Sequence, residues 1–244
     1  MRINILNKGA DRVCAGIVVA ACACLLFSDT FFTWYMNTTQ NHPFMAGFGK
    51  FALLGTLGES LAQRLLTGRY LPPGFRPLAR ALLWGLLGVC ISAAFIIFSA
   101  GAPCMLAALG LDWAPRALTG PLGIRKVITA FAISLTMNTM FAPVLMVAHK
   151  IGDMRIAMVA DGPRYPGEGF NVGATLAEID WNRMWDLVLY RSLLFFWVPA
   201  HTVTFLLPPA FRVLFAAVLG AVLGLILAWA AAREKKPAPP EVLL

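Results

Sequence analysis

Charged residues are scarce in this chain. They make up 13% of its 244 residues, while 59% of the residues are hydrophobic and the mean hydropathy is strongly positive. A soluble domain carries about 25% charged residues, so this composition excludes an ordinary soluble protein. We therefore expect an integral membrane protein.

The sequence also lacks the short motifs of common enzymes. It contains no Walker loop, no Gly-x-Ser-x-Gly turn, no His-Glu-x-x-His motif and no Gly-x-Gly-x-x-Gly fingerprint. Its five cysteines are odd in number and include no Cys-x-x-Cys pair, which argues against a disulfide framework or a thiolate zinc site. We expect no enzyme activity, no cofactor and no metal.

A nucleic-acid partner is not expected, although the formal net charge is +8. No basic stretch is interleaved with aromatic residues that could stack on bases. The lysines and arginines instead follow the positive-inside pattern of membrane proteins. With six spans and both termini cytoplasmic, the inner segments hold Arg2, Lys8, Arg12, Arg64, Arg69, Arg76, Arg80, Lys150, Arg155, Arg164, Arg183, Arg233, Lys235 and Lys236. The outer segments hold only Arg116, Arg125, Lys126 and Arg212.

Long apolar segments recur along the chain, and a membrane-spanning helix needs about 20 such residues. We predict an all-α, polytopic membrane helix bundle of about six transmembrane helices, or five if one of the more polar segments does not span. The predicted spans lie near residues 13–36, 44–66, 79–100, 127–148, 185–207 and 211–232. They form a single membrane domain over residues 1–232, with a polar loop at 150–183 and a disordered tail at 233–244.

The second predicted span contains Lys50, Glu59 and Gln63. A charge in the middle of a bilayer costs about 2.5 to 3.5 kcal/mol, so Glu59 should face the bundle interior, a partner or water. Gln63 lies four residues after Glu59 and shares its helix face, whereas Lys50 points to the opposite side. Arg191 is an expected ion-pair partner for Glu59. The expected polar interior or permeation path comprises Glu59, Gln63, Asn138, Arg191 and His201.

A metal site is a weaker alternative. His149 and Asp153 lie four residues apart, and Glu59 and His201 are further potential ligands. The spacing is common, however, and His149 lies near the end of a span, where a cation is favourable. An intramembrane metal-dependent enzyme would require Glu59, His149 and His201 to converge.

Small residues recur at four-residue steps on the second and last spans and lie on one side of the third, a pattern that lets membrane helices approach closely. These residues are Gly47 and Gly55 with Glu59 on the second span, Gly85, Gly88 and Ser92 on the third, and Ala216, Gly220 and Gly224 on the last.

Several motifs resemble those of one membrane protein family. His42-Pro43 is followed by Gly58-Glu59, sixteen residues after the histidine, and by Gln63. Further along stand Asn138 before Phe141-Ala142-Pro143, and Pro208-Pro209 before Arg212. These motifs resemble, in order, those of the Mpv-seventeen and peroxisomal twenty-two-kilodalton membrane protein family. The chain departs from the family in having Glu59 for its aspartate, Met137 for another aspartate, and an additional span.

The resemblance implies a small multi-span membrane protein with channel-like passage of an unidentified small solute. The motif positions that carry it are His42, Pro43, Gly58, Glu59, Gln63, Pro143, Pro208 and Arg212. A non-conducting structural or assembly protein is the main alternative. Membrane lipids are the expected partners, and a homo-oligomer is left open. The expected location is the bacterial inner membrane, since Asp11 and the lack of serine before Ser28 are unlike a transit peptide; an organellar membrane is the alternative.

Overall fold

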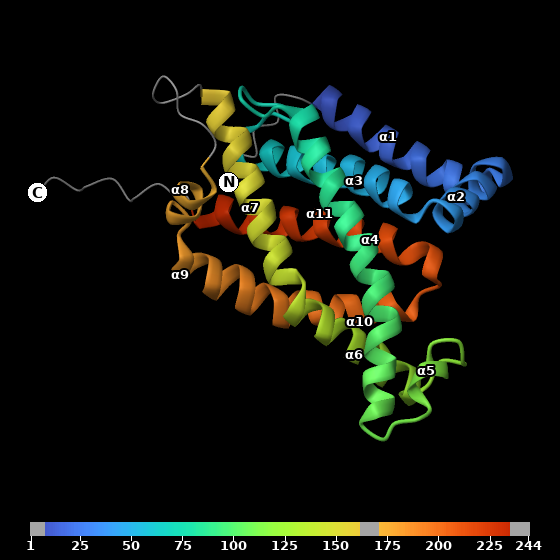
Figure 1. Ribbon diagram of the computed structural model, residues 1–244. Helices are drawn as coiled ribbons and strands as arrows, with labels where there is room; N and C mark the ends of the chain where they lie inside the picture. Colours follow the sequence, from blue (N-terminus) through green and yellow to red (C-terminus); the bar gives the residue numbers. More distant parts are fainter. Residues whose placement is uncertain (1–7, 162–170, 235–244) are drawn as a thin grey trace, which may run out of the picture.

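The computed structural model describes residues 8–161 and 171–234, and these residues form helices and no strand (Figure 1). The first half contains α1 (Lys8–Phe27), α2 (Asp29–Asn41), α3 (Pro43–Thr67), α4 (Pro77–Ala108) and α5 (Ala114–Ala117). The second half contains α6 (Ile124–Met140), α7 (Ala142–Asp161), α8 (Val172–Ala177), α9 (Trp181–Arg183), the π-helix η1 (Met184–Trp197), α10 (Val198–Leu206) and α11 (Pro209–Glu234).

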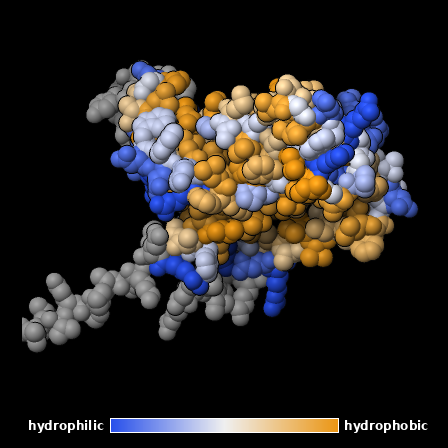
Figure 2. Space-filling view, turned by 90° about the horizontal axis from the view of Figure 1, so that it is seen from below, coloured by the Kyte–Doolittle hydropathy of each residue, from blue (hydrophilic) through white to orange (hydrophobic). Residues whose placement is uncertain are grey.

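Several of these helices suit a membrane. Among the described residues, α1, α4 and α11 are long and apolar enough to cross one, and the bent pair α6 and α7 adds a fourth span if it counts as one. Hydrophobic side chains cover the middle of the face shown in Figure 2, and hydrophilic side chains gather toward its edges. These features fit a helical protein embedded in a membrane.

The expected span at 13–36 is two helices in the structure. The Ser28 hydroxyl caps α2 by accepting a hydrogen bond from the Phe31 amide at 3.3 Å, which ends α1 at Phe27. The apolar, membrane-length part is therefore Gly9–Phe27, and the more polar α2 follows as a separate element.

The expected span at 127–148 is also broken. Helices α6 and α7 meet at Phe141 with a bend of 46°. Pro143, in the first turn of α7, has no amide hydrogen to donate to the preceding turn, which accounts for a break here. Helix α7 then continues to Asp161, so the expected polar loop at 150–183 is shorter than predicted and also contains α8 and α9.

The remaining segments differ less from expectation. The expected spans at 44–66, 79–100 and 211–232 correspond to α3, α4 and α11, and the span at 185–207 corresponds to η1 with α10. Residues 162–170 of the expected loop and 235–244 of the expected tail lie outside the described residues.

Helix α3 lies between α4 and α11, and small residues make these contacts possible. A Cβ atom on Gly88 would lie 2.5 Å from the Gly47 carbonyl oxygen, and one on Gly58 would lie 2.8 Å from Ala221. The close packing expected for α3 and α4 is thus observed. On α11 the close contact is at Ala221, because a Cβ on Gly224 would meet nothing within 4 Å.

Polar contacts join α3 to α1 and α2 to α11. Near its last turn, Arg64 donates to both carboxylate oxygens of Asp11 on α1 at 2.9 and 2.8 Å, and the Tyr70 hydroxyl donates to Asp11 at 2.7 Å. Burial and this hydrogen bond raise the pKa of Tyr70 to about 12, so the phenol remains a donor at neutral pH. The Tyr35 hydroxyl of α2 donates to the Ala210 carbonyl oxygen, in the first turn of α11, at 2.8 Å.

Replacing Gly88 with alanine should destabilise the bundle, because the new methyl group would collide with the backbone of α3. Overpacking of this kind costs about 1 to 3 kcal/mol. Gly101→Ala on the same helix is the matched control, since its Cβ would meet nothing within 4 Å. Thermal unfolding in detergent should show a lower midpoint for Gly88→Ala only, and equal midpoints for the two variants would contradict this packing.

Candidate functional site: a cavity between the helices and its charged end

Arg80, in the first turns of α4, joins two acidic side chains from other helices. Its Nη1 donates to Glu59 Oε2 of α3 and, at 3.0 Å, to Asp153 Oδ1 of α7. Its Nε donates to the Phe75 carbonyl oxygen at 2.7 Å, and its guanidinium lies 4.9 Å from the centre of the Phe75 ring. One guanidinium therefore connects α3, α7 and the segment before α4.

The second carboxylate oxygen of Glu59 is also satisfied. Trp84 Nε1 donates to Glu59 Oε1 at 2.9 Å, and His149 Nε2 lies 3.4 Å from the same oxygen. The Trp84 and His149 rings are in contact, with centroids 4.4 Å apart. The Glu59 side chain is only 19% exposed, so these contacts replace the water that a buried carboxylate would otherwise need.

The expected pairing of Glu59 with Arg191 is wrong. Arg191 pairs with Asp186 on its own helix, at 3.1 Å between Nη2 and Oδ2, and its side chain is 63% exposed. The ion-pair partner of Glu59 is Arg80, and the order of the helices explains this pairing. Helices α3 and α4 are antiparallel neighbours joined by nine residues, so a basic residue early in α4 meets an acidic residue late in α3.

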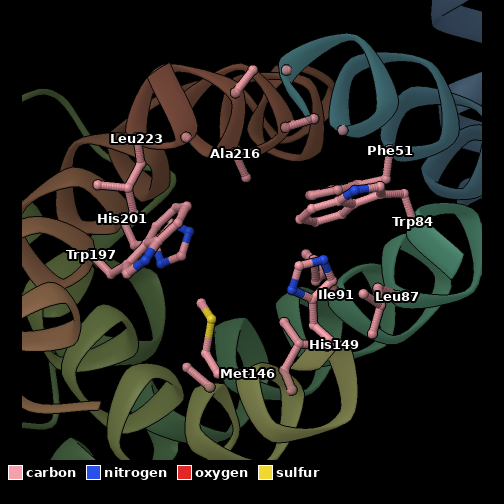
Figure 3. Close-up of a pocket in the computed structure, with 18 of the residues that line it drawn as sticks. Phe51, Trp84, Leu87, Ile91, Met146, His149, Trp197, His201, Ala216 and Leu223 are labelled. Atoms are coloured by element: carbon pink, nitrogen blue, oxygen red, sulfur yellow. The ribbon is translucent and has the colours of Figure 1, made fainter. Parts of the chain in front are cut away.

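A cavity of about 260 Å³ lies between the helices beside this charged cluster (Figure 3). Its walls come from α3, α4, α6, α7, η1, α10 and α11 and are almost entirely apolar. Trp84 and His149 line one side, and Trp197 and His201 line the other. Glu59, which also lines the cavity, is hydrogen-bonded to Trp84. Gln63 is partly buried but does not line the cavity, and neither does Arg191.

Asn138 and His201 form a buried pair in this cavity. The Asn138 side-chain amide lies 3.1 Å from His201 Nδ1, and its nitrogen also donates to the Ser134 carbonyl oxygen at 2.8 Å. Asn138 is 1% exposed and His201 is 8% exposed, and the Trp197 ring stacks on His201 with centroids 4.9 Å apart. The structure therefore places Asn138 and His201 in the same cavity as Glu59.

Two ring nitrogens that line the cavity are buried without a hydrogen-bond partner among the described residues. They are Trp197 Nε1 and His149 Nε2, the latter at ion-pair distance from Glu59 but without hydrogen-bond geometry. An unpaired buried donor costs about 1 to 3 kcal/mol. A molecule in the cavity that offered a hydrogen-bond acceptor would recover part of that cost at Trp197.

Glu59, His149 and Asp153 could also hold a metal ion, because they offer ligand atoms that lie within 4.8 Å of one another. Arg80 already donates to both carboxylates, however, and supplies the positive charge that an ion would bring. Metal binding would require Arg80 to move away. His201 is not part of this group, so the convergence needed for a metal-dependent enzyme is not observed among these residues.

A second cavity, of about 380 Å³, lies between α2, α3, α4 and α11. It opens beside the start of α3 and the start of α11, since Pro43 and Pro209 line it. Phe95 lines both cavities. This ring is 5% exposed and packs edge-on against His201, with centroids 5.7 Å apart, and against Phe205 at 5.0 Å.

The motif residues of the family resemblance lie mainly at helix junctions. His42 ends α2 and caps α3, whose first residue is Pro43, and Gly58 provides the close approach to α11. Pro143 and Pro208 lie beside the α6–α7 bend and the α10–α11 turn, and Arg212 Nε donates to the Leu207 carbonyl oxygen across that turn at 2.9 Å. Comparisons with protein-family models, curated proteins and solved structures find no match for the chain.

Removing Arg80 should destabilise the protein, because Glu59 and Asp153 lose the guanidinium that they share. Arg80→Met leaves two carboxylates without their guanidinium and should lower the free energy of unfolding by about 3 kcal/mol. Glu59→Gln should lower it by a similar amount, because it leaves the guanidinium without one of its carboxylate partners. The double variant should lose clearly less than the sum of the two, with a coupling energy of about 1 to 3 kcal/mol.

The matched control replaces Arg191, the other arginine considered for this role. The losses of unfolding free energy caused by Arg191→Met and Glu59→Gln should be additive, because Arg191 is exposed and pairs with Asp186. Additive losses in the Arg80 cycle, measured as unfolding free energies in the same detergent, would refute the ion pair.

Proposed function

We propose that this protein is a multi-span membrane protein that lets small solutes pass through its helix bundle in a channel-like manner. The observation that carries the proposal is Phe95. This one side chain forms part of the wall of both cavities, which supports the proposal that the two spaces form one path with the Phe95 ring between them. Movement of the ring would connect them.

The chemistry along this path suits a gated route for small solutes. Polar groups lie at its two ends, with Glu59 and His149 in the first cavity and Lys50 and Arg212 in the second. Between them, apolar side chains predominate, with the buried Asn138–His201 pair beside Phe95. Apolar constrictions gate channels by excluding water until they widen. The motifs that resemble the Mpv-seventeen family independently support channel-like passage.

We further propose six membrane crossings with both termini cytoplasmic, in a bacterial inner membrane. In this arrangement α3 and the η1–α10 pair cross in addition to α1, α4, the bent α6–α7 pair and α11. The Asp11–Arg64 contact supports it, because it places the start of α1 beside the end of α3. The Tyr35–Ala210 contact also supports it, because it places α2 beside the start of α11.

A non-conducting structural protein is the competing candidate, and one observation favours it. The Arg80 network ties α3, α4 and α7 together, which is sufficient reason for the charged residues to be present. An enzymatic role for Glu59, His149 and Asp153 is not proposed, because Arg80 holds both carboxylates.

The experiment is solute flux into liposomes that contain the purified protein. Uncharged solutes of increasing size should enter faster than into empty liposomes up to a size limit. Phe95→Ala should raise the rate about tenfold, equivalent to lowering the barrier by about 1.4 kcal/mol, because it removes the ring between the cavities. Phe95→Trp should lower the rate.

Two controls separate passage from loss of structure. Ile97→Ala changes an exposed side chain on the same helix, 63% exposed, and should leave the flux unchanged. Phe→Ala in a core costs about 3 to 5 kcal/mol, so Phe95→Leu provides a milder variant with an intermediate flux. If the wild type and both smaller variants match empty liposomes while remaining folded, the structural alternative holds.

A further inference from the structure

Lys50 and Arg212 both line the second cavity, although they lie on different helices, α3 and α11. Lys50 is partly buried and its ammonium lies 4.5 Å from the centre of the Tyr35 ring. The Arg212 guanidinium lies 5.7 Å from the centre of the Phe205 ring. Packing against aromatic faces holds both cations at the cavity wall.

No carboxylate neutralises these two cations within the part of the chain that the structure describes. The lining of the cavity includes no aspartate or glutamate, and the ion pairs of the described residues do not involve Lys50 or Arg212. This differs from Arg80 and Arg64, which each contact an acidic side chain. Two partly desolvated positive charges that line one cavity are unfavourable unless an anion compensates them.

Both side chains also retain hydrogen-bond donors. Lys50 donates one hydrogen bond within the described part of the chain, from Nζ to Thr39 Oγ1 at 2.8 Å, and an ammonium group has three donors. Arg212 donates through Nε to the Leu207 carbonyl oxygen at 2.9 Å, which leaves the outer edge of the guanidinium available. A guanidinium edge can bind two oxygens of a phosphate or carboxylate group at once.

Other groups at the cavity suit the same ligand. Gln40 and Ser99 line it and can donate hydrogen bonds to an anion. Helices α3 and α11 begin there, at Pro43 and Pro209, so the positive ends of two helix dipoles point to one space.

We propose that the Lys50–Arg212 cavity is a binding site for an oxyanion, either a free phosphate or the phosphate of an anionic lipid headgroup. The cavity volume of about 380 Å³ accommodates such a group. Binding there does not depend on the passage of solutes, so the site stands whether or not the bundle conducts.

The first arm of the test measures the thermal midpoint of the full chain in neutral detergent against inorganic phosphate. Sodium chloride at equal ionic strength corrects for screening. The second arm places the protein in phosphatidylcholine nanodiscs with or without phosphatidylglycerol. Free-anion binding raises the midpoint saturably with phosphate, and headgroup binding raises it with phosphatidylglycerol alone.

The variants Lys50→Met and Arg212→Met should each weaken the apparent affinity about tenfold, and the double variant should abolish the stabilisation. Arg116→Met removes the same charge from an exposed position on α5 and should leave the affinity unchanged. The charge-preserving pair Lys50→Arg and Arg212→Lys should retain binding, which keeps the test open if a methionine variant fails to fold.

The proposal is overturned if neither phosphate nor phosphatidylglycerol raises the wild-type midpoint, or if both charge-removing variants respond as the wild type does. Loss of anion binding would leave the flux of uncharged solutes as a separate measurement. The failure of one proposal is therefore distinguishable from the failure of the other.

Discussion

The hydrogen bonds and ion pairs of Arg80 allow acidic side chains to lie partly buried between the apolar helices of this bundle. An unpaired, buried carboxylate raises the free energy of the folded state, and two such groups close together would also repel each other. A single guanidinium meets Glu59 and Asp153 while its Nε holds the Phe75 carbonyl oxygen. Lysine presents its charge at one point and lacks this planar set of donors. The relative positions of α3, α4 and α7 at this end therefore depend on an arginine.

The two irregular parts of the helices, the α6–α7 bend and η1, lie beside the first cavity. Helix α6 ends at the Phe141 bend, just after Asn138, and η1 ends at Trp197, just before His201. Irregular backbone inside a membrane protein is tolerated where other groups satisfy it. The Val198 carbonyl oxygen, at the junction of η1 and α10, accepts from Ser134 Oγ at 2.7 Å. The same distortions that break the regular helix pattern thus bring two polar side chains to the cavity.

Composition and small-residue spacing predicted the helical class and the close packing of α3 on α4, because both depend on local sequence. The breaks at Ser28 and Phe141 were missed because a hydropathy pattern records apolar length and ignores a serine cap or a bend. The Glu59–Arg191 prediction failed for a different reason. It matched opposite charges by depth in the membrane, whereas the partner depends on which helices are neighbours. Phe95 carries no sequence signal, since its position in the linings of both cavities depends on how the helices pack.

The charged groups at the two ends of the proposed path differ in whether an acidic or basic partner balances them, and this difference determines which solutes the proposed path would admit. Glu59 has a cationic partner, Arg80, within the protein, although Asp153 shares it. Lys50 and Arg212 have no described acidic partner at the second cavity. An anion attracted there would have to leave two cations and enter an apolar region past Phe95, where no compensating charge lines the wall. It would be retained at the entrance, and uncharged solutes would be the ones that cross.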